Sequence, residues 1–380
     1  MVGGFDKYYQ IAKCFRDEGF RADRQPEFTQ LDMEMAFVTQ EDVMSTIESA
    51  VKTLWKEAKG MDLFNEDFPK LTYDDAMKYY GSDKPDLRFD GKIAFSLVSD
   101  STAVEGLLLK GRGRSSLNRD GSFEFCLPIE GIQSKEVLKA FEAGKESLSK
   151  WHGNYLEDCG IISEKERENI KLRLEELGLN VGPRDCLLIQ KRDLYANVGM
   201  TDLGRARLAA LSVLQEHQPE LIAKDPKFLW VHSFPLFCRA SPESIADNPL
   251  RRYDSMHHPF TAPEMPNPKD IFTFEEPLKL RAQHYDLVLN GQEIGGGSVR
   301  IHDADIQERL MRELLGLSRQ QIDHFSHLLR ALKLGAPPHA GMALGLDRLV
   351  AILAGKQSIR DVIAFPKNSA GFDLCLKAPN

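Results

Sequence analysis

Residues 15–34, with the sequence FRDEGFRADRQPEFTQLDME, decide the fold of this chain because they join two predicted strands through a charged loop. Alternating side chains predict strands over residues 7–16 and 28–38. One face of the second strand is polar and carries Gln30, Asp32 and Glu34. A strand inside a sheet has covered faces, so these polar side chains indicate either one solvated face or the floor of a ligand-binding cleft.

The loop over residues 17–27 is too long for a tight hairpin and carries six charged side chains. Its composition fits a solvated loop, and it also fits a binding loop. In the second interpretation Arg16 and Arg24 contact a phosphate, because guanidinium groups bind phosphate through paired hydrogen bonds. Asp32, on the polar face of the strand that follows, would then recognise an amine.

Apolar periodicity, together with Gly and Ser at element ends, predicts the remaining elements. Helices are expected over residues 41–59, 163–177, 201–217, 304–315 and 318–334 and from 345 to 355, and strands over residues 228–237, 283–289 and 295–301. A chain of 380 residues exceeds one ordinary domain. The pattern of predicted elements changes in the middle of the chain, which indicates an inserted domain. This domain divides the chain into residues 1–98, 99–227 and 228–380.

Asp286, Glu293 and Arg300 recur at intervals of seven on two consecutive predicted strands. Two carboxylates beside a phosphate site indicate magnesium, which prefers oxygen ligands. The glycines at 295–297 would let a ligand approach the backbone closely, and they are also compatible with a bulge.

His257 and His258 are adjacent and could in principle hold a metal ion. Adjacent side chains in a strand point to opposite faces. The pattern therefore favours one histidine that faces a substrate and one with a structural role.

Arg348 stands at a predicted helix start, where the positive end of the helix dipole disfavours a cation. A bound anion or base would offset this effect, with Arg348 on one side of a purine and Phe28 on the other. A surface ion pair with Asp347 or Asp361 is the alternative explanation.

Composition excludes several classes of protein. Hydrophobic residues make up 42% of the chain and charged residues 28%, which is typical of a globular protein, and no apolar run reaches the ~18 residues of a membrane span. The six cysteines show neither CxxC pairs nor zinc-finger spacing, so reduced thiols are expected. The net charge of −8 leaves only local basic patches for contacts with RNA.

Taken together, these segments resemble a known family. Residues 15–34 resemble motif 2 of the class II aminoacyl-tRNA synthetases, and GMALGLDRL at 341–349 resembles motif 3. Four further stretches resemble the aspartyl enzymes of bacteria and mitochondria: GSDKPDLRF at 81–89, MHHPFTAP at 256–263, GGGSVRIHD at 295–303 and IRDVIAFPK at 359–367. A lysyl or asparaginyl relative would not be expected to show this set.

The resemblance implies an α+β fold: a six-stranded antiparallel sheet flanked by helices, interrupted by an inserted α+β domain similar to the GAD domain. It implies ATP-dependent activation of L-aspartate, with Mg²⁺, and transfer to tRNA(Asp). The expected full-length form is a homodimer that does not bind membranes. The C-terminal segment and the divergent insertion of this chain slightly favour a location in the mitochondrial matrix over one in the bacterial cytoplasm.

The resemblance also assigns roles by matching motif positions. Catalysis is expected from Arg16 and Arg348. The nucleotide contacts are expected from Arg16, Asp17, Glu18, Gln25, Phe28, Glu293, Gly345, Leu346, Asp347 and Arg348. The aspartate contacts are expected from Arg16, Asp32, His257 and Arg300, and the magnesium ligands are expected to be Asp286 and Glu293.

Three elements of the family are missing from this sequence: the anticodon-binding barrel, the dimer-forming motif 1 and a lysine that recognises aspartate. The resemblance therefore predicts a chain that is shortened at its N-terminus and begins inside a structured region. Two alternatives remain open. In the first alternative, the chain is a non-catalytic module that binds ATP and aspartate. In the second, it is an enzyme that charges asparagine tRNA in addition to aspartate tRNA.

Overall fold

The computed structural model of the chain describes residues 1–16, 24–89, 93–109, 164–176, 186–195, 199–217, 219, 222–368 and 370–373. The chain divides into two compact units. Unit 1 comprises Met1–Lys70, Leu229–Val288 and Glu293–Asn380, and unit 2 comprises Leu71–Phe228 and Leu289–Gln292.

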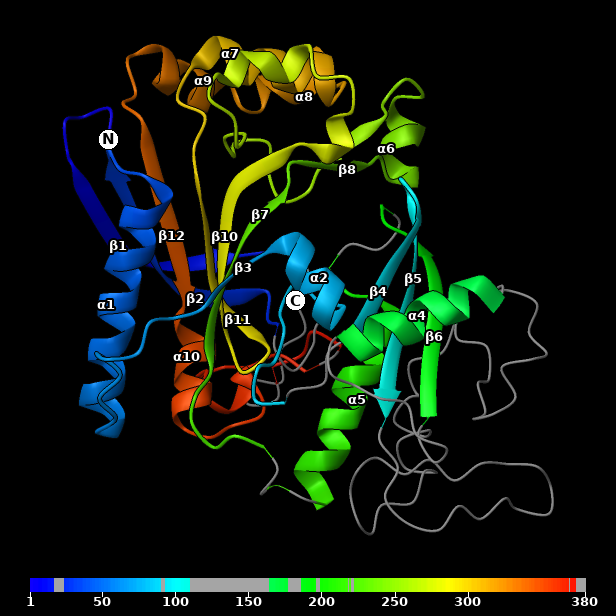
Figure 1. Ribbon diagram of the computed structural model, residues 1–380. Helices are drawn as coiled ribbons and strands as arrows, with labels where there is room; N and C mark the ends of the chain where they lie inside the picture. Colours follow the sequence, from blue (N-terminus) through cyan, green and yellow to red (C-terminus); the bar gives the residue numbers. More distant parts are fainter. Residues whose placement is uncertain are drawn as a thin grey trace. The chain divides into compact units, whose positions relative to one another are not determined.

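Unit 1 is built on a large sheet with the strand order β1-β2-β12-β11-β10-β7-β3 (Figure 1). The strands are β1 (Lys7–Phe15), β2 (Glu27–Ala36), β3 (Lys70–Thr72), β7 (Phe228–Pro235), β10 (Arg281–Leu289), β11 (Gln292–Val299) and β12 (His339–Gly345). β1 pairs with β2, β2 with β12 and β12 with β11, all antiparallel. The predicted α+β fold with an antiparallel sheet is confirmed, but the expected number of six strands was wrong, because the short strand β3 adds a seventh at the edge beside β7.

Helix α1 (Gln40–Lys59) covers one face of this sheet. It begins with a capping box between Thr39 and Asp42 and ends at Gly60, which has a φ of 68°. The indole N–H of Trp230, on β7, donates to Glu48 of α1 at 2.8 Å. Trp230 packs edge-on against Tyr285 of β10, so Tyr285 points to the face of the sheet that α1 covers. The residues on either side of Tyr285 in β10 therefore point to the opposite face. The polar face of the sheet is therefore the one that α1 leaves uncovered.

Strand β12 was not predicted, although it lies between β2 and β11 in the middle of the sheet. Its sequence, HAGMALG, is rich in small residues with low strand propensity. Three short helices, α7 (Ala304–Arg309), α8 (Arg319–Asp323) and α9 (Ser326–Lys333), gather at one end of the sheet (Figure 1). β12 runs from that end to the end where α10 (Leu346–Leu353) begins (Figure 1). The expected helix after 345 is confirmed.

The helices expected over 304–315 and 318–334 are each interrupted, so these predictions were too simple. The first consists of α7 (Ala304–Arg309) followed by a π-helical turn over Leu310–Leu314, and the second of α8 (Arg319–Asp323) and α9 (Ser326–Lys333). Between α8 and α9 the ring of Phe325 packs edge-on against Phe260 at 5.4 Å. Tertiary packing thus overrides a continuous helical periodicity.

Unit 2 contains an antiparallel sheet of β4 (Ile93–Ser99), β5 (Thr102–Leu109) and β6 (Cys186–Asp193). Its helices are α2 (Tyr73–Tyr80), α4 (Glu164–Glu176) and α5 (Asp202–His217), the last two close to the helices expected at 163–177 and 201–217. The expected insertion, 99–227, lies inside unit 2, which starts earlier because α2 packs on β4. None of the helices that the structure describes is long and apolar enough to span a membrane.

Candidate active site

Small residues form the floor of the uncovered face of the sheet. Asp32 pairs with Gln10 on β1 and with Ala343 on β12, and Ala343 pairs with Gly296 on β11. Residues directly opposite one another in an antiparallel sheet point to the same face. Polar side chains from the outer strand therefore border a strip of Ala and Gly on which a ligand can lie against the backbone.

Two carboxylates meet above Gly296. A Cβ atom added there would lie 2.5 Å from Oδ1 of Asp286 and 3.5 Å from Oε1 of Glu293. Asp286 is only 2% exposed, and its Oδ1 lies 3.0 Å from Nε2 of His284. No cluster of three or more metal-binding side chains occurs among the described residues. Two carboxylates suit magnesium, which takes its other ligands from phosphate groups and water, so this site fits that ion.

The two arginines expected to contact the nucleotide lie on either side of the start of β2. The guanidinium carbon of Arg16 lies 5.1 Å from the ring centre of Phe28. The next residue, Thr29, donates its backbone N–H to Oδ2 of Asp347 at 2.7 Å, which fastens β2 to the first turn of α10. The guanidinium of Arg348 donates to the backbone carbonyl of Glu293. Arg348 is thus partly buried and contacts β11.

Gln25 is almost fully buried, with 4% of its surface exposed. Its amide oxygen accepts from the backbone N–H of Lys367 at 2.7 Å, and its nitrogen donates to the carbonyl of Arg24 at 3.0 Å. Gln25 therefore ties the end of the charged loop to the segment around Lys367. Asp17 and Glu18 lie outside the described residues.

Toward the other end of the polar face, Arg300 is held by two partners. Its Nη2 donates to Oε1 of Glu34 at 2.9 Å, and its Nη1 lies 2.9 Å from Nε2 of His258. Burial, followed by the charge of Arg300, lowers the pKa of His258 to about 3. A neutral His258 can accept a hydrogen bond from Arg300. Asp32 accepts from the amide of Gln10 at 3.0 Å.

The histidine pair does not lie in a strand, so the premise of the sequence interpretation was wrong. Both residues lie in the irregular segment that follows β9 (Tyr253–Ser255). His257 stacks on His284 with ring centres 3.7 Å apart, while His258 contacts Arg300. Both histidines therefore touch residues of the site.

Sequence reasoning did not identify His258 or His284 as members of the site. A signal for His284 was present, because it lies two positions before Asp286 in one strand and must share its face. No comparable signal existed for His258, whose contact with Arg300 depends on how the bend folds over the sheet.

Comparison with known proteins places this geometry in context. The family model described as tRNA synthetases class II (D, K and N) matches residues 1–369. An aspartate–tRNA ligase of Porphyromonas gingivalis is 40% identical, with 100% of this chain and 62% of that protein covered. A mitochondrial aspartate–tRNA ligase of Rattus norvegicus is 42% identical, with 100% of this chain and 57% of that protein covered.

Among solved structures, an aspartyl-tRNA synthetase from Entamoeba histolytica has a TM-score of 0.42 and 15% identity, with 97% of this chain and 49% of that chain covered. The chain spans less than two thirds of the length of the two curated relatives. One of these relatives is a bacterial enzyme and the other is a mitochondrial enzyme.

Proposed function

Because the chain belongs to the class II tRNA synthetases of the D, K and N group, we propose that it carries the amino-acid-activating site of an aspartate–tRNA ligase. One observation carries this proposal: Arg16, Arg348 and the carboxylates of Asp286 and Glu293 border the same uncovered, glycine-floored face. Cations for phosphate and carboxylates for magnesium are the groups that nucleotide activation requires.

The proposed reaction needs no nucleophile from the protein. The α-carboxylate of L-aspartate attacks the α-phosphorus of ATP in line, and aspartyl-adenylate forms as pyrophosphate leaves. The acyl group then passes to the terminal ribose of tRNA(Asp), and AMP leaves. The protein contributes by positioning the reactants and by stabilising the charge that develops on the phosphate.

Arg16 and Arg348 would provide that stabilisation. Arg16 would hold the α-phosphate and the substrate carboxylate, and Arg348 would stack on the purine opposite Phe28. The bond from Thr29 to Asp347 supports this arrangement, because it keeps the two sides of the purine slot together. The remaining nucleotide contacts are proposed for Asp17, Glu18, Gln25, Glu293, Gly345 and Leu346.

Asp286 and Glu293 would hold the magnesium ion. When bound, this ion would neutralise negative charge on the phosphates. The bond between His284 and Asp286 supports the role, because a fixed carboxylate is pre-organised for its ligand.

Arg300 would select aspartate through its side-chain carboxylate. An asparagine amide in the same place would face a cation without neutralising it, which is the basis of discrimination. Asp32 would receive the amino group of the substrate, and His257 would line the pocket. Glu34 and His258 support this role by holding the guanidinium of Arg300 in place.

The wider context is also part of the proposal. The partners would be tRNA(Asp), ATP and L-aspartate, and the full-length form would be a homodimer. Residues 99–227 would be the inserted domain between the two parts of the catalytic domain. The proposed location is the mitochondrial matrix, with the bacterial cytoplasm as the alternative.

Aspartate-dependent exchange of pyrophosphate into ATP tests the activity directly, in the chain and in its full-length form. We expect exchange in the full-length form and its loss by roughly 100-fold or more in Arg16→Ala. Arg312→Ala is the matched control, because Arg312 is exposed and, within the described part of the chain, forms ion pairs with Glu308 and Glu313 only. Exchange that survives Arg16→Ala would refute the phosphate assignment, and binding of ATP without any exchange would favour a non-catalytic module.

Specificity is tested by replacing Arg300 with leucine. The variant should lose its dependence on aspartate, and an unchanged apparent affinity for aspartate would refute the role of Arg300. Charging of purified tRNA(Asp) and tRNA(Asn) by the full-length form then separates a discriminating enzyme from one that charges both.

A further inference from the structure

The segment at 81–89, GSDKPDLRF, has no part in the proposed reaction. It lies in unit 2 directly after α2, which ends at Gly81 with a φ of 64°. Asp86, within this segment, is only 2% exposed. Its carboxylate accepts from the backbone N–H of Arg88 at 2.9 Å and forms an ion pair with the Arg88 guanidinium at 2.6 Å. The side chain of Asp86 is therefore fixed within the segment.

Arg207 of α5 holds the same segment from a second element. It is 1% exposed, and its Nη2 donates to the backbone carbonyls of Asp86 at 2.8 Å and Phe89 at 2.5 Å. Its guanidinium also lies over the rings of Tyr80 and Phe89, at 5.0 and 5.4 Å from the ring centres. Hydrogen bonds from a charged donor are stronger than those from a neutral one. Arg207 therefore fixes the backbone at Asp86.

The segment packs against the turn between β10 and β11. This turn, Leu289–Gln292, also belongs to unit 2. Asn290 and Gly291 have φ values of 51° and 79°, which are typical of a two-residue hairpin turn of type I′. A Cβ atom added to Gly291 would lie 3.0 Å from the Cβ of Asp86. Asn290 accepts from the N–H of Lys227 through Oδ1 at 2.9 Å and donates its own N–H to the Lys227 carbonyl at 3.1 Å. Two separate segments thus hold the turn.

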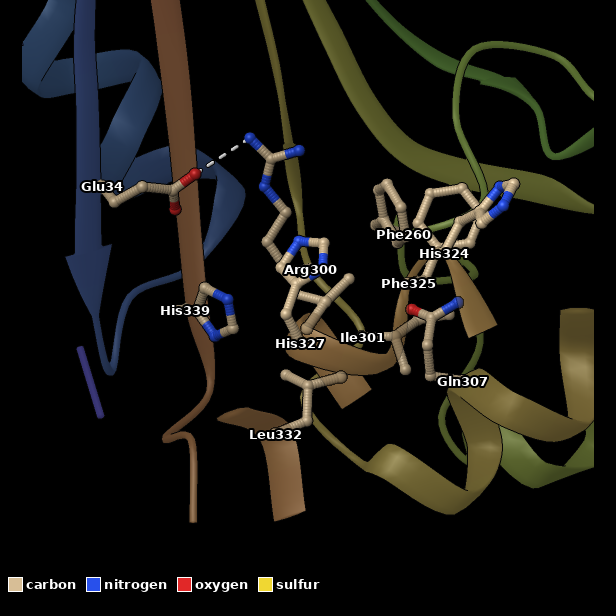
Figure 2. A pocket seen from close by; sticks show the side chains of 11 residues that line it. Glu34, Phe260, Arg300, Ile301, Gln307, His324, Phe325, His327, Leu332 and His339 are labelled. Atoms are coloured by element: carbon tan, nitrogen blue, oxygen red, sulfur yellow. Dashed lines mark hydrogen bonds and ion pairs between the residues drawn. The ribbon is translucent and has the colours of Figure 1, made fainter. Parts of the chain in front are cut away.

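The two ends of the proposed site are fixed in different ways. Arg300 is held directly by its ion pair with Glu34, and both residues line a cavity of about 420 Å³ (Figure 2). The carboxylates of Asp286 and Glu293 instead lie on the two strands of one hairpin, β10 and β11. Their relative position therefore depends on how the turn of that hairpin is held.

Glu293 follows the turn immediately and makes two contributions to the site. Its carboxylate meets that of Asp286 above Gly296, and its backbone carbonyl accepts from the guanidinium of Arg348. A displaced turn would move the backbone of Glu293. It would therefore disturb one magnesium ligand and the hydrogen bond of Arg348 together.

We propose that Asp86 and Arg207 are positioning residues for the magnesium site. By fixing the turn they hold Glu293 where it can share one ion with Asp286. The inference rests on the proposed function, because it takes Asp286 and Glu293 as the magnesium ligands. Carboxylates that are fixed before the ion arrives lose less freedom on binding, so the ion binds more tightly. The segment at 81–89 thereby acquires a role in metal binding without touching the ion.

Mn²⁺ is the probe, because it prefers the same oxygen ligands as Mg²⁺ and its free form can be measured by electron paramagnetic resonance. Asp286→Asn in the full chain should remove the site and so defines specific binding. Arg207→Met should raise the Kd for Mn²⁺ roughly tenfold. Arg192→Met is the matched control, because Arg192 is also a buried arginine of unit 2 but binds Glu105 in the β4–β5–β6 sheet. At a temperature where both variants stay folded, the control should bind Mn²⁺ as the unaltered chain does.

A second pair of variants tests the contact with Asp86 directly. Gly291→Ala places a Cβ against Asp86 and should raise the Kd for Mn²⁺ roughly tenfold. Gly60→Ala is the matched control, because Gly60 has a similar φ of 68° but an added Cβ there meets nothing within 4 Å. Both alanines carry the strain of a left-handed backbone, so only the contact distinguishes them. The Gly60→Ala variant should bind Mn²⁺ normally.

Hydrogen exchange of the metal-free protein, followed by mass spectrometry, reports on the turn itself. Arg207→Met should speed exchange over residues 289–296, and Arg192→Met should not. Exchange at the turn that Arg207→Met leaves unchanged overturns the positioning role, whatever the metal result.

The Mn²⁺ titrations separate this inference from the proposed function. Binding that Asp286→Asn leaves unchanged overturns the metal assignment of the proposed function. Binding that Asp286→Asn removes, but that Arg207→Met and Gly291→Ala leave unchanged, overturns the positioning role alone. Equal weakening by Arg207→Met and Arg192→Met also overturns it, because general loss of stability in unit 2 would then explain the effect.

Discussion

Gly296 and Gly297, two of three consecutive glycines on β11, make room for different groups, because successive positions of a strand face opposite sides. The Cα of Gly296 points to the side where Asp286 and Glu293 meet, and an added Cβ would lie 2.5 Å from an oxygen of Asp286. At Gly297 an added Cβ would collide with the backbone carbonyl of Gly341 on β12. One glycine thus makes room for carboxylates and the next makes room for a neighbouring strand.

Gly296→Ala should therefore displace Asp286 and alter the response to magnesium. We expect the Mg²⁺ concentration for half-maximal pyrophosphate exchange to rise roughly tenfold or more, as when a metal ligand loses its support. Gly297→Ala should instead lower the free energy of unfolding by about 1–3 kcal/mol, through overpacking against backbone. Equal Mg²⁺ dependence in Gly296→Ala and the unaltered protein would contradict this division of roles.

His258 makes the stability of unit 1 dependent on pH. Its pKa is about 3 in the folded chain, against 6.5 for an ordinary histidine, because burial and Arg300 disfavour its charged form. As the pH falls below about 6.5 the unfolded chain gains a proton that the folded chain does not take up, so stability is lost on acidification.

At pH 5.5 this effect amounts to about 1.4 kcal/mol of unfolding free energy. Urea titrations at pH 7.5 and pH 5.5 should show that loss in the unaltered protein and a correspondingly smaller loss in His258→Gln. The comparison cancels the contributions of other titrating groups. The same pH dependence in both proteins would show that His258 does not remain neutral.

At the scale of elements, α1 depends on its capping box as well as on its apolar stripe. The side chain of Thr39 accepts from the N–H of Asp42, and Asp42 in turn accepts from the N–H of Thr39 at 2.8 Å. These bonds satisfy donors that the first turn of a helix otherwise leaves free. The cap therefore fixes where α1 starts immediately after β2.

Thr39→Ala should lower the free energy of unfolding by about 1 kcal/mol, the usual cost of losing an N-cap side chain. Thr53→Ala in the same helix is the control, because the Thr53 hydroxyl only bonds back to the carbonyl of Ser49. Alanine has the higher helix propensity, so this control should show no loss. Equal effects of the two changes in a thermal melt would contradict the role of the cap.

At the scale of the whole molecule, each of the two units has its own stabilising core. In unit 2 the buried side chain of Glu105, on β5, accepts from Arg192 on β6 at 2.8 Å. Burial raises the pKa of Glu105, and Arg192 opposes that rise. The partner arginine thus offsets part of the cost of burying this carboxyl group inside the sheet of unit 2.

Arg192→Met should destabilise unit 2 by about 3–5 kcal/mol, because it leaves Glu105 buried without a partner. Hydrogen exchange followed by mass spectrometry should show faster exchange in β5 and β6 and no change in β2 and β12. Arg173→Met is the control, since Arg173 pairs with Glu176 on the exposed surface of α4, where an ion pair contributes little. Faster exchange throughout both units would show that they unfold together.

The amino-acid sequence by itself determined the elements whose signals are local. The sequence predicted β1 and β2 from their alternation, α1 from its apolar periodicity, and the unusual position of Arg348 at a helix start. The two motifs identified the family. These features depend on residues a few positions apart, where propensity and side-chain direction act directly.

Only the tertiary structure decided which distant residues meet. Glycine-rich β12 has little strand propensity of its own and becomes a strand because β2 and β11 supply its hydrogen-bond partners. Arg300 reaches Glu34 across 266 positions, and His258 joins them from the irregular segment after β9, contacts that no local pattern encodes. Pairing and packing over such separations select among many compatible local arrangements, which is why the site became visible only in the folded chain.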